Sequence, residues 1–215
     1  MLLQGNQGQT GKAVGQGQTL GFGEYTDALV SELMPRYYEQ TYRGNTFVAA
    51  NQAAVTSTTA LTASSLNFTL FNPLGSGKNL VMLKIDMTVL PVTETTAGLA
   101  EVVLVANVAP SQAAPATVTA LTPICTLLGS SANPVGKAYS TATLAAVPTV
   151  IKALATIISP TAVGGAAVIA PSLNFDLEGG VIITPGNYVS IQSISTTETT
   201  APGLLCSIKW MEIPQ

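Results

Sequence analysis

The sequence predicts a mainly β protein, an antiparallel β-sandwich preceded by an extended amino-terminal arm and a short helix. Apolar and polar residues alternate with period two at 83–89 and at 204–210, a pattern typical of strands with one solvated face. Thr and Val are abundant, and Pro, Gly and Asn interrupt the pattern roughly every ten residues, as in sandwiches. Two segments of this β region also repeat each other. These three observations favour paired antiparallel sheets and leave little room for long helices.

The chain divides near residue 44, where its composition changes. Residues 1–43 hold seven of the 19 charged side chains and four of the six tyrosines, whereas residues 44–77 hold no charge. We therefore expect residues 1–43 to form an arm with a short helix, residues 44–64 a linker or first strand, and residues 65–215 the β-sandwich. The arm begins with a Gln/Gly tract at 4–18 that has little to bury, so we expect it to become ordered only on a neighbour.

The short helix is predicted at residues 24–34. Tyr25, Leu29 and Leu33 recur at i, i+4 and i+8, and acidic residues occupy the first turn of this amphipathic pattern. Pro35 follows, and its ring would end or kink the helix.

Residues 36–43 place three tyrosines between two arginines. Aromatic and guanidinium side chains are enriched at protein interfaces, because they bury a large area while keeping polar groups for the partner. We predict that this segment and the helix before it anchor the chain to another subunit. The predicted anchor residues are Tyr25, Leu29, Leu33, Arg36, Tyr37, Tyr38, Tyr42 and Arg43.

An internal repeat is the most informative feature of the β region. The sequence SLNF at 65–68 recurs at 172–175, and TETTA at 93–97 recurs at 197–201, in the same order. Between the two matches, each copy has a turn rich in Pro, Gly and Asn that leads into a strand pattern. Chance similarity in a Thr- and Ala-rich background is the alternative. The matches are collinear and SLNF contains Phe and Asn, so we expect a structural repeat.

The repeat units span 65–107 and 172–212, and the connection at 108–171 would supply crossing strands and long loops. Such paired units fit a jelly roll, whose eight strands form two sheets. Within the connection, the β-branched residues at 149–158 favour a strand over a helix. The TETTA segments are expected to form exposed loops. Their predicted exposed residues are Thr93, Glu94, Thr95, Thr197, Glu198 and Thr199.

The composition argues against catalysis, metal binding and nucleic-acid binding. The chain has no histidine, only 9% of its residues are charged, and its eight Lys and Arg residues are dispersed. A chain without imidazole lacks the usual general base near neutral pH and the commonest transition-metal ligand, and nucleic acid requires clustered basic residues. We therefore predict no catalytic residue, no metal ligand and no cofactor.

Two short motifs that could suggest a site have structural interpretations. The sequence GSGK at 75–78 lacks both the first Gly and the final Ser or Thr of a phosphate-binding loop, so it indicates a turn between strands. Asp176 and Glu178 are the closest acidic pair outside the arm and could in principle act as acid and base. No basic residue or aromatic cluster surrounds them in the sequence, which indicates a solvated strand end.

The sequence also bears on compartment. The apolar stretch at 142–158 is shorter than the roughly 20 residues of a spanning helix, and it contains Pro148 and Lys152. The first residues show neither the basic nor the apolar region of an export signal, so we expect folding in a cytoplasm. Cys125 and Cys206 are accordingly expected to be buried free thiols, with a disulfide as the alternative.

Three stretches of the chain resemble virion proteins of tailed bacteriophages. LFNPLGSGKNLV at 70–81 is similar to a turn segment of these proteins, and TPGNYVSI at 184–191 with IKWMEIP at 208–214 is similar to their carboxyl-terminal part. The resemblance covers residues 65–215. It implies a β-rich, jelly-roll-like virion component, such as a capsid decoration, head-fibre or tail-associated protein. The motifs are turns and strands, so it implies no catalytic or ligand residues.

We therefore expect a structural virion component, folded in the cytoplasm of the host bacterium, that docks through its arm onto capsid, tail or sibling subunits. Low charge favours this function, because neighbouring copies cover a surface poor in Lys and Glu at low entropic and desolvation cost. The expected partners are copies of itself, for example in a trimer, and other virion proteins, with neither nucleic acid nor membrane. One alternative is a receptor- or carbohydrate-binding tip. Another is a bacterial surface-layer or pilus subunit, which would need an export signal.

Overall fold

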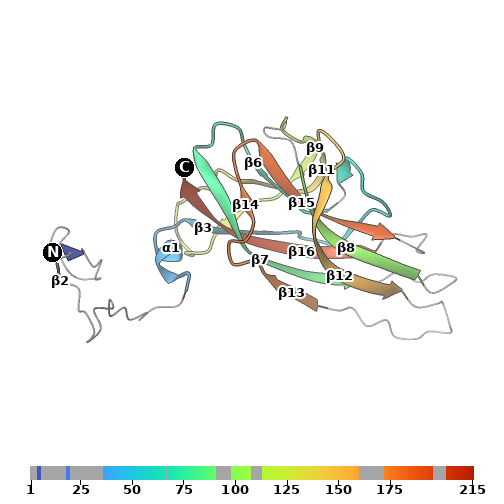
Figure 1. Cartoon of the computed structure of the whole chain (residues 1–215), viewed down its shortest axis with the longest axis horizontal. Coiled ribbons are helices and arrows are strands. Elements are labelled where there is room, and N and C mark those ends of the chain that lie inside the picture. Colours follow the sequence, from blue (N-terminus) through green and yellow to red (C-terminus); the bar gives the residue numbers. More distant parts are fainter. Residues whose placement is uncertain are drawn as a thin grey trace. The chain divides into compact units, whose positions relative to one another are not determined.

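Two antiparallel sheets packed face to face form the β-sandwich in this computed structural model (Figure 1). The chain falls into two compact units, Met1–Tyr38 and Glu39–Gln215, and the sandwich belongs to the second. In the first unit, β1 (Gln4–Gly5) pairs with β2 (Gln18–Thr19). The structure describes residues 4–5, 18–19, 36–65, 67–90, 98–107, 113–159, 172–195 and 202–215.

One sheet has the strand order β10-β3-β16-β7-β13, with β4 beside β16 and β14 beside β7; we call it the β16 sheet. Its two longest strands, β7 and β16, pair along their whole length. The strands of this sheet are β3 (Thr46–Ala50), β4 (Val55–Thr56), β7 (Lys78–Leu90), β10 (Ile124–Cys125), β13 (Ser172–Asp176), β14 (Ile182–Ile183) and β16 (Gly203–Pro214).

The other sheet has the order β12-β8-β15-β6-β11-β5, with β9 beside β11; we call it the β15 sheet. Its edge strand β12 covers the segment that the β-branched residues predicted as a strand, and this prediction is confirmed. The strands of this sheet are β5 (Ser64–Ser65), β6 (Thr69–Asn72), β8 (Gly98–Ala106), β9 (Ala116–Ala120), β11 (Lys137–Thr143), β12 (Thr149–Ser159) and β15 (Asn187–Ser195).

Eight of these strands follow the chain path of a jelly roll. Numbered along the chain as β3, β6, β7, β8, β12, β13, β15 and β16, they form one sheet in the order 1-8-3-6 and the other in the order 5-4-7-2. Jelly rolls consist of two such four-stranded sheets built from Greek keys. The predicted fold class, a jelly-roll-like antiparallel sandwich, is confirmed.

The two repeat units place their corresponding strands in opposite sheets. The strands β6, β7 and β8 of the first unit match β13, β15 and β16 of the second. The β6–β15 pair corresponds to the β13–β7 pair, and the β15–β8 pair corresponds to the β7–β16 pair. The partners at the outside also match, because β12 pairs with β8 as β3 pairs with β16. The fold therefore has a topological two-fold that relates the two repeat units.

The inner faces of the two sheets form the core. On β7, Ile85 and Val89 are buried while Asp86 and Thr88 between them are partly exposed, as the period-two pattern predicts. Trp210 of β16 is fully buried and packs against Phe47 of β3, with ring centroids 6.1 Å apart. Burial of apolar residues that face each other across the two sheets supplies the main stabilisation of this fold.

The sandwich begins earlier than the expected boundary at residue 65. The strand β3 lies inside the 44–64 segment, for which a linker or a first strand was expected, and it pairs with β16. The described helix, α1 (Tyr38–Tyr42), follows Pro35 and is stabilised by an ion pair of 2.7 Å between Arg43 and Glu39. The helix predicted at 24–34 lies outside the described residues.

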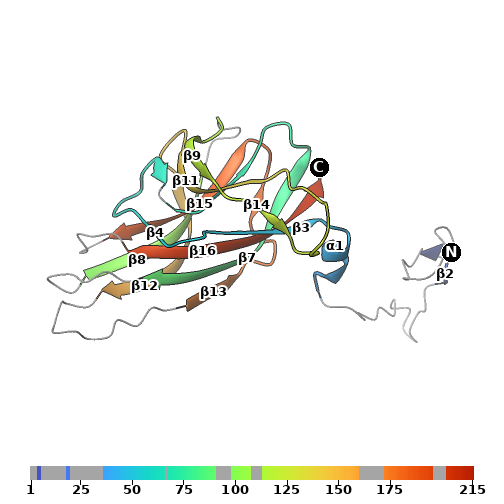
Figure 2. The same ribbon diagram turned by 180° about the vertical axis from the view of Figure 1, so that it is seen from behind.

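On one side of the sandwich, the edge strands of the two sheets lie next to each other. The strands β12 and β13 form the outermost strands of their sheets on this side, and both views place them beside each other (Figures 1 and 2). Among the described residues, no helix has the length and apolar character that crossing a bilayer requires.

Candidate functional site

The anchor residues predicted from the sequence are described only in part. Within residues 36–43, the Arg36 guanidinium lies 5.6 Å from the centre of the Tyr37 ring, a cation–π contact. Tyr38 and Tyr42 are 40% and 57% exposed. Tyr25, Leu29 and Leu33 lie outside the described residues, and so the anchor stays a prediction.

The two TETTA segments also lie outside the described residues, but the strands that flank them are described. Leu90 at the end of β7 pairs with Gly203 at the start of β16, and Ser195 at the end of β15 pairs with Ala100 of β8. The chain therefore leaves and re-enters both segments at the same end of the sandwich. The exposed TETTA loops themselves stay a prediction.

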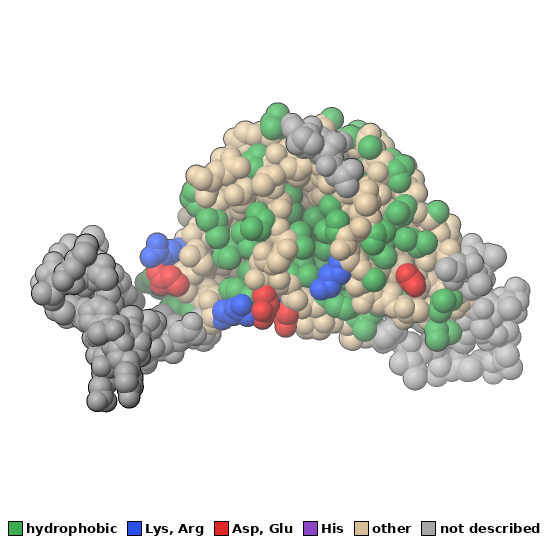
Figure 3. Space-filling model, in the orientation of Figure 1, with side chains coloured by type: hydrophobic (Ala, Val, Ile, Leu, Met, Phe, Trp, Pro, Cys, Tyr) green, Lys and Arg blue, Asp and Glu red, His purple; other side chains and the backbone are tan. Residues whose placement is uncertain are grey.

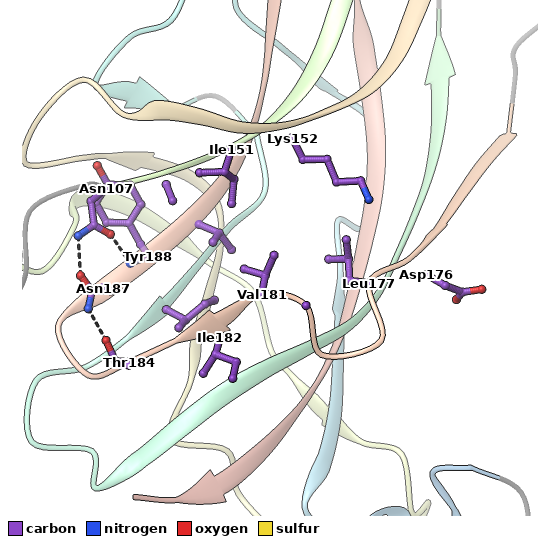
Figure 4. A pocket seen from close by; sticks show the side chains of 14 residues that line it. Asn107, Ile151, Lys152, Asp176, Leu177, Val181, Ile182, Thr184, Asn187 and Tyr188 are labelled. Atoms are coloured by element: carbon purple, nitrogen blue, oxygen red, sulfur yellow. Dashed lines mark hydrogen bonds between the residues drawn. The ribbon is translucent and has the colours of Figure 1, made fainter.

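A cleft of about 810 Å³ opens on the side where β12 and β13 form the sheet edges. Its apolar lining includes Ile151 of β12, Ile182 of β14, and Leu177 and Val181 from the segment between β13 and β14 (Figure 4). Ile151 and Ile182 are 44% and 56% exposed. The view in Figure 3 shows hydrophobic side chains across the middle of one face of the sandwich, with the charged side chains in its lower half.

One wall of the cleft is a chain of directed hydrogen bonds (Figure 4). The backbone N–H of Tyr188 donates to Asn107 Oδ1 over 2.9 Å, which identifies that atom as the oxygen. Asn107 Nδ2 donates to Asn187 Oδ1 over 2.5 Å, and Asn187 Nδ2 donates to Thr184 Oγ1 over 2.6 Å. Because the Thr184 oxygen accepts in this chain, its hydroxyl proton is directed elsewhere. This wall of the cleft is therefore polar, with its amide groups fixed in orientation.

The other wall of the cleft carries charge. The Lys152 side chain extends across the cleft toward Leu177, whereas the Asp176 carboxylate points away from it (Figure 4). Lys152 has no ion-pair partner within the part of the chain that the structure describes. The charge that faces the cleft is therefore positive.

A buried carboxylate is the strongest polar centre of the sandwich, and the sequence interpretation missed it. Glu212 is fully buried, and it accepts hydrogen bonds from the backbone N–H of Val135 at 3.1 Å and of Gly136 at 2.9 Å. Lys78 Nζ lies 3.2 Å from Glu212 Oε2, and the indole N–H of Trp210 donates to Oε1 over 3.4 Å. These contacts hold the loop before β11 against β16, which is a structural role.

The alternation along β16 could have predicted that Glu212 is buried. Leu204, Cys206, Ile208 and Trp210 alternate toward the core, and Glu212 continues the same alternation. An acid at an inward position requires buried partners, because an unpaired buried charge is strongly destabilising.

The motif GSGK at 75–78 is a turn between β6 and β7, as its sequence indicated. Asn72 Nδ2 donates to the carbonyls of Lys78 and Ile183 over 2.8 Å each, and Ser76 Oγ donates to Asn72 Oδ1 over 2.7 Å. The fully buried Asn72 side chain thus fixes this turn and ties it to β14. The central residues of the motif at 70–81, which carries the resemblance, therefore fix a turn between two strands.

The remaining chemistry-bearing residues do not assemble into a reaction centre in the described part of the chain. Asp176 ends β13 and Glu178 lies in the following turn, and both are exposed. Cys125 and Cys206 are free buried thiols. The described residues contain no group of three or more Cys, Asp and Glu side chains that could hold a metal ion.

Comparison with known proteins finds no family model, curated protein or solved structure that matches this chain. Its function is therefore inferred from the fold and its surfaces.

Proposed function

We propose that this chain is a non-enzymatic structural component of a bacteriophage virion, which docks through its amino-terminal arm onto capsid, tail or sibling subunits. The observation that carries the proposal is the lack of charge in one long section of the sandwich. Between Glu101 and Asp176 the chain has only two charged side chains, Lys137 and Lys152. The structure exposes much of this section.

The exposed residues of this section include large apolar side chains. Leu128, Val147 and Ile124 are 82%, 60% and 56% exposed, and all five residues of β9 are exposed. Apolar surface that is free of charged neighbours is typical of surfaces that another protein covers. A particle built from many copies would cover it without removing long charged side chains from water.

The fold and the sequence resemblance support the same proposal. Jelly rolls form the subunits of many viral capsids, and they also occur in lectins, so the fold alone favours no single function. The phage resemblance covers residues 65–215, and its first motif contains the turn that Asn72 fixes. A motif with a structural task fits a scaffold protein better than a catalyst.

The test is incorporation into particles. A phage that encodes this chain, with its own gene deleted, is grown in cells that supply either the full chain or a version lacking residues 1–35, which keeps α1. Mass spectrometry of purified particles then counts the copies of each. We expect many copies of the full chain and almost none of the shortened one.

Two results would contradict parts of the proposal. Full incorporation of the shortened chain would show that the arm is not the anchor. Absence of the full chain from particles would overturn the virion assignment itself.

A receptor- or carbohydrate-binding tip is the second candidate. It is favoured by the flanking strands of the two TETTA segments, which end at the same end of the sandwich. Sugar sites usually need exposed aromatic rings, but among the aromatic residues of the strands from β11 onward, Tyr188 and Trp210 are 1% and 0% exposed and Tyr139 is half-buried. Saturable binding of the full chain to host cells or to a glycan panel, lost on replacing Glu94 and Glu198 by Ala, would favour this candidate.

A further inference from the structure

We propose that the cleft between β12 and the β13–β14 segment binds residues 24–34 of a second copy of this chain. The inference rests on the proposed function, because it names the surface of a sibling subunit that the arm occupies.

The first step is the apolar part of the cleft. Ile151 and Ile182 are 44% and 56% exposed and line the cleft together with Leu177 and Val181. The cleft volume of about 810 Å³ is in the range of sites that enclose a small ligand. It is large enough for several side chains and too small for a whole helix, so it suits the apolar face of a segment that lies across it.

The second step is the polarity of the walls. Lys152 extends across the cleft, the Asp176 carboxylate points away, and the hydrogen-bond chain ends at the hydroxyl of Thr184 (Figure 4). The positive charge of Lys152 favours a partner with acidic side chains. The cleft therefore selects a segment that is both apolar and acidic.

The third step is the match within the chain itself. Residues 24–34 carry three acids, Glu24, Asp27 and Glu32, and no base. The predicted helix has its apolar residues at i, i+4 and i+8, which is the spacing with which amphipathic helices fill grooves. The charge of the segment is thus opposite to the charge that faces the cleft.

The segment comes from a sibling copy. A segment exchanged between copies creates the contact between subunits that the proposed function requires, whereas a segment folded onto its own sandwich leaves the copies unconnected. This commitment makes the source of the segment part of the test.

The test uses the full chain with a photo-cross-linking amino acid in place of Ile151. Copies with natural and heavy nitrogen are mixed, irradiated and digested, and mass spectrometry identifies the joined peptides. We expect Ile151 to join residues 24–34 of a differently labelled copy. The matched control places the same photo-reactive residue at Ile158, which is 70% exposed on the same strand and outside the cleft, and should not reach that segment.

Charge reversal tests the role of Lys152. Lys152→Glu should lower the yield of the inter-copy cross-link by about tenfold, because it sets like charges together, and Glu32→Lys in the same chain should restore much of it. Lys137→Glu, at an exposed position outside the cleft, should leave the yield unchanged.

Each other outcome overturns the inference. Cross-links within one copy, cross-links to other residues, an absence of cross-links, or equal effects of the two lysine reversals would each exclude the exchanged segment. The cross-linking results can be distinguished from a failure of the proposed function, which is measured by incorporation into particles. If residues 1–35 are needed for incorporation into particles but cross-link elsewhere, the proposed function stands and the cleft assignment falls.

Discussion

The two sheets of the sandwich have similar inner faces and different outer faces. On the outer face of the β16 sheet, Lys84 and Asp86 form an ion pair of 3.2 Å with side chains that are 35% and 46% exposed. On the outer face of the β15 sheet, Ser190 and Gln192 are fully buried. The sequences of β7 and β15 both alternate apolar and polar residues, but only one of the two polar faces meets water.

The difference arises from what covers the β15 sheet. The segment before β6 crosses its outer face, and Ser65 Oγ lies 2.7 Å from Ser190 Oγ. Gln192 exchanges hydrogen bonds with the backbone of Thr62, at 2.9 and 3.2 Å. A polar stripe on a strand therefore indicates solvent only when no other segment offers it hydrogen-bond partners.

The largest expected effect concerns the interior that the two sheets share. Glu212→Ala would leave Lys78 and the N–H groups of Val135 and Gly136 without their acceptor, and we expect a loss of about 3–5 kcal/mol in the free energy of unfolding. Urea unfolding measures it. Glu101→Ala, at an exposed position on β8, is the control and should change stability by less than about 0.5 kcal/mol. Equal losses would show that the buried carboxylate contributes no special stability.

The second expected effect is a loss of stability at alkaline pH. Burial raises the pKa of the Cys206 thiol from 9.0 to about 12, so the folded state keeps this proton after the unfolded state has lost it. The contribution of Cys206 to stability is therefore constant below about pH 9, and falls by about 1.4 kcal/mol per pH unit between there and pH 12. Burial also raises the pKa values of Tyr139 and Tyr188 in the β15 sheet, with the same sign.

Comparison with Cys206→Ala isolates the thiol. Between about pH 9 and pH 10.5, urea unfolding of the natural chain should lose about 2 kcal/mol more than the variant loses. Equal slopes for the two proteins would mean that Cys206 ionises as readily in the folded state as in the unfolded one.

The third effect tests the outer faces directly with one residue type. Ser190→Ala removes a hydroxyl that contacts those of Ser65 and Thr69, and we expect a loss of about 1–3 kcal/mol. Ser207→Ala, at the half-buried outer face of the β16 sheet, should change stability by less than about 0.5 kcal/mol. Thermal and urea unfolding measure the loss of stability in each variant. Equal losses would show that the outer faces of the two sheets do not differ in this respect.

The smallest effect is expected on the solvated face. Asp86→Asn removes the ion pair with Lys84, and exposed ion pairs contribute about 0–1 kcal/mol that salt screens further. We expect a change below about 0.5 kcal/mol at moderate salt. A loss as large as that of Ser190→Ala would mean that this face is far less exposed to water than its burial indicates.

The sequence predicted the sandwich well because two signals were strong. Alternation identified β7 and β16, and the repeat anticipated the correspondence between the two halves of the jelly roll. For the region of β3, the sequence did not distinguish a linker from a strand. Its five residues, TFVAA, are too few to show a period, and their burial depends on pairing with β16.

The candidate site was less predictable, because its residues meet only in the folded chain. Ile151 and Ile182 are distant in sequence. They line the same cleft because β12 and β14 lie on the same side of the sandwich, in different sheets. Their surroundings in the sequence contain no motif for a ligand. The cover over Ser190 was equally hidden, because it depends on hydrogen bonds between segments far apart in the chain.

The pairing of β3 with β16 also orders events during synthesis. The strand β3 comes first among the described strands of the sandwich and its long partner β16 comes last, so a growing chain on the ribosome cannot close this sheet before β16 has emerged. Folds dominated by such distant pairings form slowly and leave strand edges open until they are complete. The arm leaves the ribosome well before the body that it belongs to has folded. A complete sandwich thus first exists only after β16 has been synthesised.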